Sequence, residues 1–142
     1  MPKIIVHAPA RAFDAAARQA IVAELTDFAL ECEKIPASPF VKSTVWTYFN
    51  LYNDGAVFMG EQPATMNIVT VHIYVIEGGL DTAGKKKLIP GVTAIFGRQL
   101  GITERPPVYI VIHEIAEVNW AIFGNQADLA ALRATPLDVP AI

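Results

Sequence analysis

The segment Met66–Ile76, MNIVTVHIYVI, decides the fold because it is long, apolar and rich in β-branched residues. Such a run predicts a β-strand, and its loose alternation indicates that both faces are covered. Gly78-Gly79 then predicts a turn, and residues 81–100 predict a helix with Asp81 or Thr82 as its cap. Pro107–Glu114, PVYIVIHE, predicts a further strand. The second half of the chain therefore reads as a β-α-β unit.

Pro90-Gly91 interrupts the helix of this unit. Proline inside a helix removes one backbone hydrogen bond and costs about 3 kcal/mol. We therefore expect either a kink at this point or a helix that begins late. Gly101 follows the last residue, as is typical of a helix C-terminus.

The first half repeats the pattern. Lys3–His7, KIIVH, predicts a strand, and Asp14 is a suitable N-cap for a helix of roughly five turns over residues 15–34. A proline-containing connector leads to Ser43–Tyr52, STVWTYFNLY, whose aromatic and β-branched residues predict another strand. The Asn53-Asp54-Gly55 turn signal and Val57–Met59 predict a small hairpin.

Two consecutive β-α-β units predict an α+β fold with a four-stranded sheet and two helices on one face. We expect residues 1–142 to form a single domain. The segment Ala116–Gly124 predicts an irregular turn, Gln126–Arg133 a last helical piece, and the residues beyond it an extended tail.

Composition narrows the class of protein. Hydrophobic residues make up 53% of the 142 residues and charged residues only 18%, so disorder is excluded and a buried subunit interface is expected. A net charge of -3 argues against nucleic acid as a partner, and no apolar run is long enough to span a membrane. With one cysteine, Cys32, and no ligand spacing around the histidines, we expect no metal and no cofactor. A cytoplasmic location is expected.

The first two residues, Met1-Pro2, contain the candidate catalytic residue. Removal of an initiator methionine is sterically easy before a small residue such as proline, and it would leave Pro2 with a secondary amine at the start of a strand. An α-amine has an unperturbed pKa of about 7.7–8.0, and an apolar pocket lowers it. Pro2 would then be a neutral, rigid base near pH 7.

Several stretches of the sequence resemble the tautomerase superfamily. They are PKIIVHAPAR near the N-terminus with LTDFA at residues 25–29, the segment Asp54–Gly60, VHIYVIEGG at residues 71–79, Val108–Val111 with Glu114, and the Asn119-Trp120 and Phe123-Gly124-Asn125 turn. The resemblance covers the chain from Pro2 to about Gly124. It implies a homotrimer that acts on a small molecule, with open sheet faces forming the centre.

The resemblance also implies an isomerase-type enzyme in which Pro2 is the general base for enol–keto tautomerisation of a small 2-oxo acid or enol. Other expected substrate-binding residues are Arg11, Glu114, Asn119, Trp120 and Phe123. Two departures argue against dehalogenase or decarboxylase activity. No arginine occurs in Ile76–Gly79, and Ala29 stands where the cis-dehalogenases carry a histidine.

Two alternatives stay open. The missing arginines favour a non-catalytic trimeric binding or scaffold protein on the same fold. A dimeric α+β-barrel ligand-binding protein would show the same β-α-β pattern.

Overall fold

The computed structural model describes residues 1–142, and its main body is one sheet with two long helices. The sheet has the strand order β2-β1-β5-β6. Neighbours β1 and β2 are parallel, as are β5 and β6, whereas β1 and β5 are antiparallel. The bounds are β1 Lys3–Pro9, α1 Ala15–Glu33, β2 Trp46–Tyr52, β5 Val69–Ile76, α3 Thr82–Leu100 and β6 Val108–Ile115. The predicted pair of β-α-β units is confirmed.

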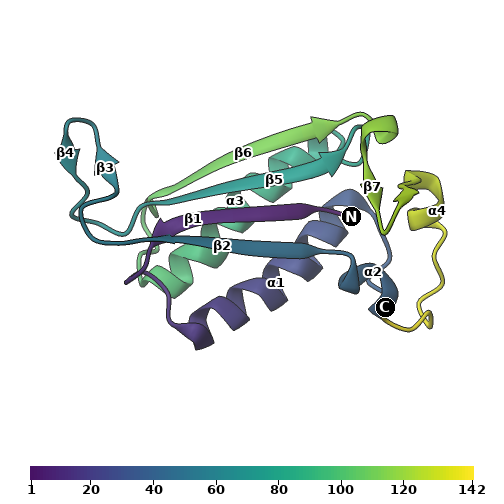
Figure 1. Cartoon of the computed structure of the whole chain (residues 1–142), viewed down its shortest axis with the longest axis horizontal. Helices are drawn as coiled ribbons and strands as arrows, with labels where there is room; N and C mark the ends of the chain where they lie inside the picture. The colour runs from purple at the N-terminus through teal and green to yellow at the C-terminus, as the bar shows by residue number, and fades with distance from the viewer.

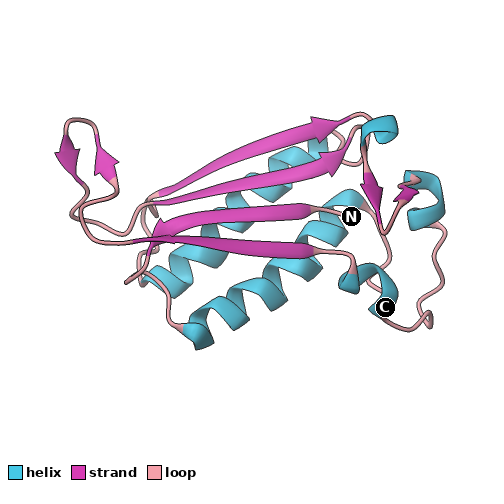
Figure 2. Cartoon of the chain, viewed as in Figure 1, coloured by secondary structure: helices cyan, strands magenta, loops and turns pink.

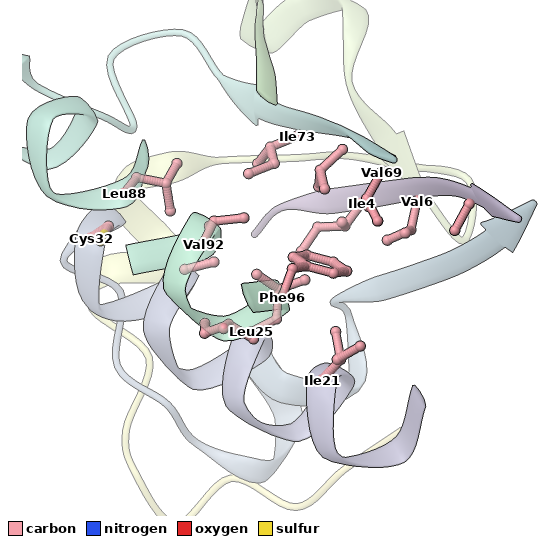
Figure 3. Packing of buried hydrophobic residues seen from close by; sticks show 14 of the residues in the cluster. Ile4, Val6, Ile21, Leu25, Cys32, Val69, Ile73, Leu88, Val92 and Phe96 are labelled. Carbon is pink, nitrogen blue, oxygen red and sulfur yellow. The ribbon is translucent and has the colours of Figure 1, made fainter. Parts of the chain in front are cut away.

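Both long helices lie on the same face of the sheet (Figure 1). Their inward side chains meet alternate residues of the strands, as Figure 3 shows for Leu25, Val92 and Phe96 on the helices and Ile4 and Ile73 on the strands. These side chains are almost completely buried. Burial of one such side chain contributes about 1.5–3 kcal/mol, so this layer is the main source of stability.

Each long helix begins at the aspartate that the sequence suggests. The Asp14 carboxylate accepts a hydrogen bond from the Ala17 amide at 2.7 Å, and Asp81 accepts one from the Gly84 amide at 2.7 Å. Helix α3 begins at Thr82 and continues through Pro90, so the expected late start is wrong. Proline is tolerated because its ring lies on the exposed side, and tertiary packing of the helix outweighs its cost.

The shorter elements depart more from expectation. They are α2 Pro39–Ser43, β3 Phe58–Met59, β4 Gln62–Pro63, the 3₁₀ turn η1 Glu117–Asn119, β7 Ala121–Ile122, β8 Asn125–Gln126 and α4 Leu129–Arg133. Helix α2 was not predicted, although Ser38 caps it and Pro39 opens it, which is a common helix start. Because α2 includes Ser43, strand β2 begins at Trp46 and not at Ser43 as expected. The last helix is shorter than expected because β7 and β8 form a hairpin before it (Figure 2).

The second sheet face carries no helix (Figure 2). Its outward residues include exposed aromatic side chains, among them Trp46, Tyr48 and Tyr109. A polar row crosses it as well, in which His72 Nδ1 lies 2.8 Å from His113 Nε2 and the His113 ring stacks on Tyr74 with centroids 4.3 Å apart. No helix of the chain has the length and apolar character needed to cross a membrane.

Candidate functional site at the start of the first strand

The N-terminus is buried where β1 enters the sheet. The Met1 side chain is only 2% exposed and packs in a second cluster of apolar residues with Leu30, Ile76 and Leu132. The Met1 amine donates to Glu33 Oε2 at 3.0 Å, and the Glu33 side chain is 1% exposed. Strand β1 and the C-terminus of α1 therefore bring an amine and a carboxylate together away from water.

Only one oxygen of the Glu33 carboxylate has a hydrogen-bond partner. Its second oxygen, Oε1, is buried and has no hydrogen-bond partner. A Cβ built on Gly79 would come within 2.9 Å of this oxygen, so only glycine lets the turn after β5 approach so closely. Arg133 of α4 donates to the backbone carbonyls of Glu33 at 3.0 Å and of Gly79 at 3.1 Å, and it leaves the carboxylate itself free.

Burial changes the proton affinity of both partners. Desolvation lowers the pKa of the Met1 amine below its usual 8.0, although the charge and the hydrogen bond of Glu33 oppose this. Desolvation also raises the pKa of the Glu33 carboxyl above its usual 4.5, against the opposing effects of the amine and Arg133. Both charged forms are disfavoured because neither is hydrated in this setting. The two groups titrate as a coupled pair.

A cavity of about 270 Å³ opens beside this pair. Seven of its ten lining residues are hydrophobic, and its polar groups come from few positions. The lining residues are Met1, Lys3, Thr44, Trp46, Tyr74, Ile115, Asn119, Trp120, Ala121 and Ile122. An apolar pocket with a few convergent polar groups is typical of a small-molecule site.

Met1 also lines a second cavity, of about 490 Å³. This one lies under the β7–β8 hairpin and includes Phe123, Gln126 and Leu132. Phe123 has a positive φ of 51° and a side chain that is 61% exposed, and its ring meets Trp46 edge-on with centroids 5.8 Å apart. Met1 is thus common to the walls of both cavities.

The structure brings together four of the residues singled out from the sequence. Pro2 is buried and directly follows Met1, and in this chain its nitrogen is a peptide nitrogen. Asn119 and Trp120 line the smaller cavity, and Phe123 lines the larger one. All three belong to the segment that follows β6.

Two expected substrate-binding residues lie elsewhere in the chain. Arg11 follows β1 at its far end, about 20 Å along the strand, and forms an ion pair with Asp54. Glu114 is paired in register with Val75, a buried residue that faces the helices, and its carboxylate binds Lys85 of α3 at 2.7 Å. Strand alternation directs its neighbours His113 and Ile115 to the open face and Glu114 to the opposite one. Neither residue reaches the cavity within this chain.

Sequence reasoning missed Lys3 and Glu33. The Lys3 ammonium lies 5.7 Å from the centre of the Tyr48 ring, and Lys3 is the one cationic residue in the wall of the smaller cavity. Lys3 lies two residues before Ile5 on the same strand, and residues two apart share a face of the sheet. This alternation could have indicated that Lys3 lies on the open face. Glu33 had a weaker signal, namely a carboxylate on the last turn of the helix beside the apolar residues Leu30 and Cys32, where a negative charge opposes the helix dipole.

Comparison with known proteins finds one family match and a shared fold. Residues 70–128 match the model of the tautomerase enzyme family. No curated protein sequence matches the chain significantly. Among solved structures, it is similar to N1, a member of the cis-3-chloroacrylic acid dehalogenase family, with 23% identity, a TM-score of 0.75, and coverage of 89% of this chain and 83% of that one.

Two further structures share the fold. The symmetric trimer of wild-type fused 4-OT gives a TM-score of 0.73 at 19% identity and covers 91% of this chain and 98% of its own. Macrophage migration inhibitory factor of Toxoplasma gondii gives a TM-score of 0.70 at 16% identity, and the match covers 88% of this chain and 99% of that one. The match to the tautomerase family model thus covers the second half of the main sheet, and the fold over most of the chain is the one that these structures share.

Proposed function

We propose that this protein is a homotrimeric tautomerase in which Pro2, after loss of Met1, is the general base for enol–keto exchange of a small 2-oxo acid or enol. The observation that carries the proposal is the position of the N-terminus. It is buried at the mouth of an apolar cavity that also presents one ammonium group and one side-chain amide, those of Lys3 and Asn119.

The proposed reaction needs one base and two binding groups. The Pro2 nitrogen accepts the proton of the enol hydroxyl, the carbonyl forms, and the same proton is delivered to the neighbouring carbon atom. Lys3 pairs with the substrate carboxylate, in place of the arginines that this chain lacks. The Asn119 amide donates to the oxygen on which negative charge develops. The walls formed by Trp46, Tyr74 and Trp120 exclude water and favour the neutral amine.

The trimer is part of the proposal. Fused 4-OT, which shares the fold, forms a trimer. In this chain the helix-free face exposes aromatic side chains, and burying them between subunits would account for the low charge content. A neighbouring subunit is also the one route by which a second cation could enter the cavity. Light scattering should give three times 15.4 kDa, whereas a dimer would favour the dimeric barrel arrangement.

The decisive test compares three proteins in an ultraviolet enol–keto assay with phenylpyruvate and 2-hydroxymuconate. They are the chain shown by intact mass to have lost Met1, the same chain with Pro2→Ala, and a matched control with Pro63→Ala in the exposed β3–β4 hairpin. We expect at least a tenfold loss for Pro2→Ala and none for the control. Equal rates for all three would disprove the role of Pro2.

One observation favours a second candidate function. Met1 fills its own space between the two cavities, and its amine is paired with Glu33. A chain that retains Met1 would have no free Pro2 amine and would act as a non-catalytic scaffold or binding protein. Retention of Met1 in the intact mass, together with rates at the solvent background, would support this function and exclude the first.

A further inference from the structure

A buried carboxylate faces the position at which the proposed base would be created. The Glu33 side chain is 1% exposed, and the only hydrogen-bond donor to its carboxylate is the N-terminal amine. Isolated buried carboxylates are costly, because a charge removed from water must be paired or neutralised. Here the amine pairs with one oxygen and leaves the other without a partner. The core therefore holds a carboxylate whose pairing depends on the N-terminus.

Loss of Met1 would move the terminal amine by one residue. The nitrogen atoms of Met1 and Pro2 are separated by three covalent bonds, so they lie no more than about 4 Å apart. Glu33 Oε2 is 3.0 Å from the Met1 nitrogen. The new amine would thus lie within about 7 Å of the carboxylate before any movement. A small shift of the strand end or one water molecule in the vacated space would connect the two groups.

The surroundings of Glu33 offer it no other cationic partner within bonding distance. From α4, Arg133 uses its guanidinium on backbone carbonyls, including that of Glu33, and acts on the carboxylate through its charge alone. On α1 and its cap, the neighbouring titratable groups are the buried Cys32 thiol, Glu31, which pairs with Lys87, and Lys34, which binds Asp81 at 2.7 Å. The turn after β5 contributes Gly79, which has no side chain. The N-terminal amine is therefore the one group placed to bind the carboxylate directly.

We propose that Glu33 is the positioning residue for the N-terminal base: its carboxylate aims the Pro2 nitrogen into the cavity and keeps that nitrogen basic. The inference rests on the proposed function and deepens it. Burial alone makes an amine a weak base, whereas a general base works best when its pKa is near the working pH. An anion beside the amine restores its affinity for a proton. Glu33 thus offsets the effect of the apolar pocket.

The experiment is a titration of the Pro2 nitrogen in the protein without Met1, by NMR with ¹⁵N-labelled proline, alongside the pH profile of kcat/KM. Glu33→Gln keeps the size of the side chain and removes its charge. We expect the midpoint of the amine and the acid limb of the profile to move to lower pH by about one unit or more, because the ammonium form loses its anion. The matched control is Glu31→Gln, two residues earlier on α1, where the exposed carboxylate pairs with Lys87. It should leave both midpoints unchanged.

If Glu33 had only a structural role, E33Q would lower the stability of the protein or the maximum kcat/KM. The midpoint of the amine titration would stay in place. A folded E33Q protein whose amine midpoint equals that of the wild type would therefore overturn the inference. If E33Q does not fold, Glu33→Asp takes its place. It withdraws the carboxylate by about 1.5 Å, and we expect a downward shift of the midpoint, whereas an unchanged midpoint would again refute the inference.

The two proposals fail separately. The NMR titration requires no turnover, so a shifted midpoint in an inactive protein would uphold the role of Glu33 and refute the tautomerase function. If Pro2→Ala inactivates the enzyme but E33Q leaves the midpoint of the amine unchanged, the tautomerase function is upheld and the role of Glu33 is refuted.

Discussion

Arg133 connects the last helix to the body of the protein, and Arg133→Met tests how strongly. Its guanidinium donates to the Glu33 carbonyl from Nη2 at 3.0 Å and from Nε at 3.3 Å, and to the Gly79 carbonyl at 3.1 Å. These carbonyls are partly buried, whereas the contact with Gly78 at 3.4 Å is exposed and adds little. Hydrogen bonds from a charged group contribute about 1.5–3 kcal/mol each, and exposure of the arginine reduces that figure. We expect a loss of about 1–3 kcal/mol.

The assay is urea unfolding of Arg133→Met beside Arg98→Met as the matched control. Arg98 forms an exposed ion pair with Glu24, and such pairs contribute about 0–1 kcal/mol. Hydrogen exchange should also show faster exchange of the α4 amides in the first variant only, since the helix loses its anchor. An unfolding free energy for Arg133→Met equal to that of Arg98→Met, with unchanged exchange in α4, would refute the reasoning.

Three further results are expected. Gly97→Ala should cost about 1–3 kcal/mol in thermal unfolding, because its Cβ would lie 2.7 Å from the Ile102 carbonyl oxygen; an unchanged melting temperature would contradict this. In the chain with Met1, Glu33 holds a proton to higher pH when folded than when unfolded, so stability should fall as pH rises from 4.5 through the raised pKa, and Glu33→Gln should lack this slope. The buried Cys32 thiol, whose raised pKa disfavours the thiolate, should react with a disulfide reagent only after unfolding, and fast reaction of the native protein would be inconsistent with its packing.

Local patterns predicted the long elements well, since hydrophobic period and capping are properties of neighbouring residues. Asp14 and Asp81 cap the two long helices, and runs of β-branched residues predicted the strands on either side of them. The short helix at Pro39 was missed because the aromatic run after it outweighed a brief cap signal. The late helix start expected from Pro90 was wrong for the converse reason, since contacts across the helix pair override a local penalty.

The candidate site was predicted in part. The superfamily resemblance assigned Asn119 and Trp120 to the site, and in the structure both residues line the cavity beside Met1. Glu114 lies away from this cavity within the chain because the direction of its side chain depends on strand register, and a shift of one residue reverses the face. Arg11 lies far from Pro2 within the chain because it follows the strand that Pro2 precedes, and the length of β1 separates the two ends.

The sequence by itself determined the two β-α-β units, their apolar faces and the place of Pro2 just before the first strand. Only the tertiary structure decided which groups meet that terminus. Glu33 is 32 residues from Met1 along the chain, and Gly79 and Arg133 are further away still. Their convergence depends on the packing of α1, α4 and the turn after β5 around the start of β1. No local pattern encodes it, because burial of a carboxylate is a property of the whole assembly of elements.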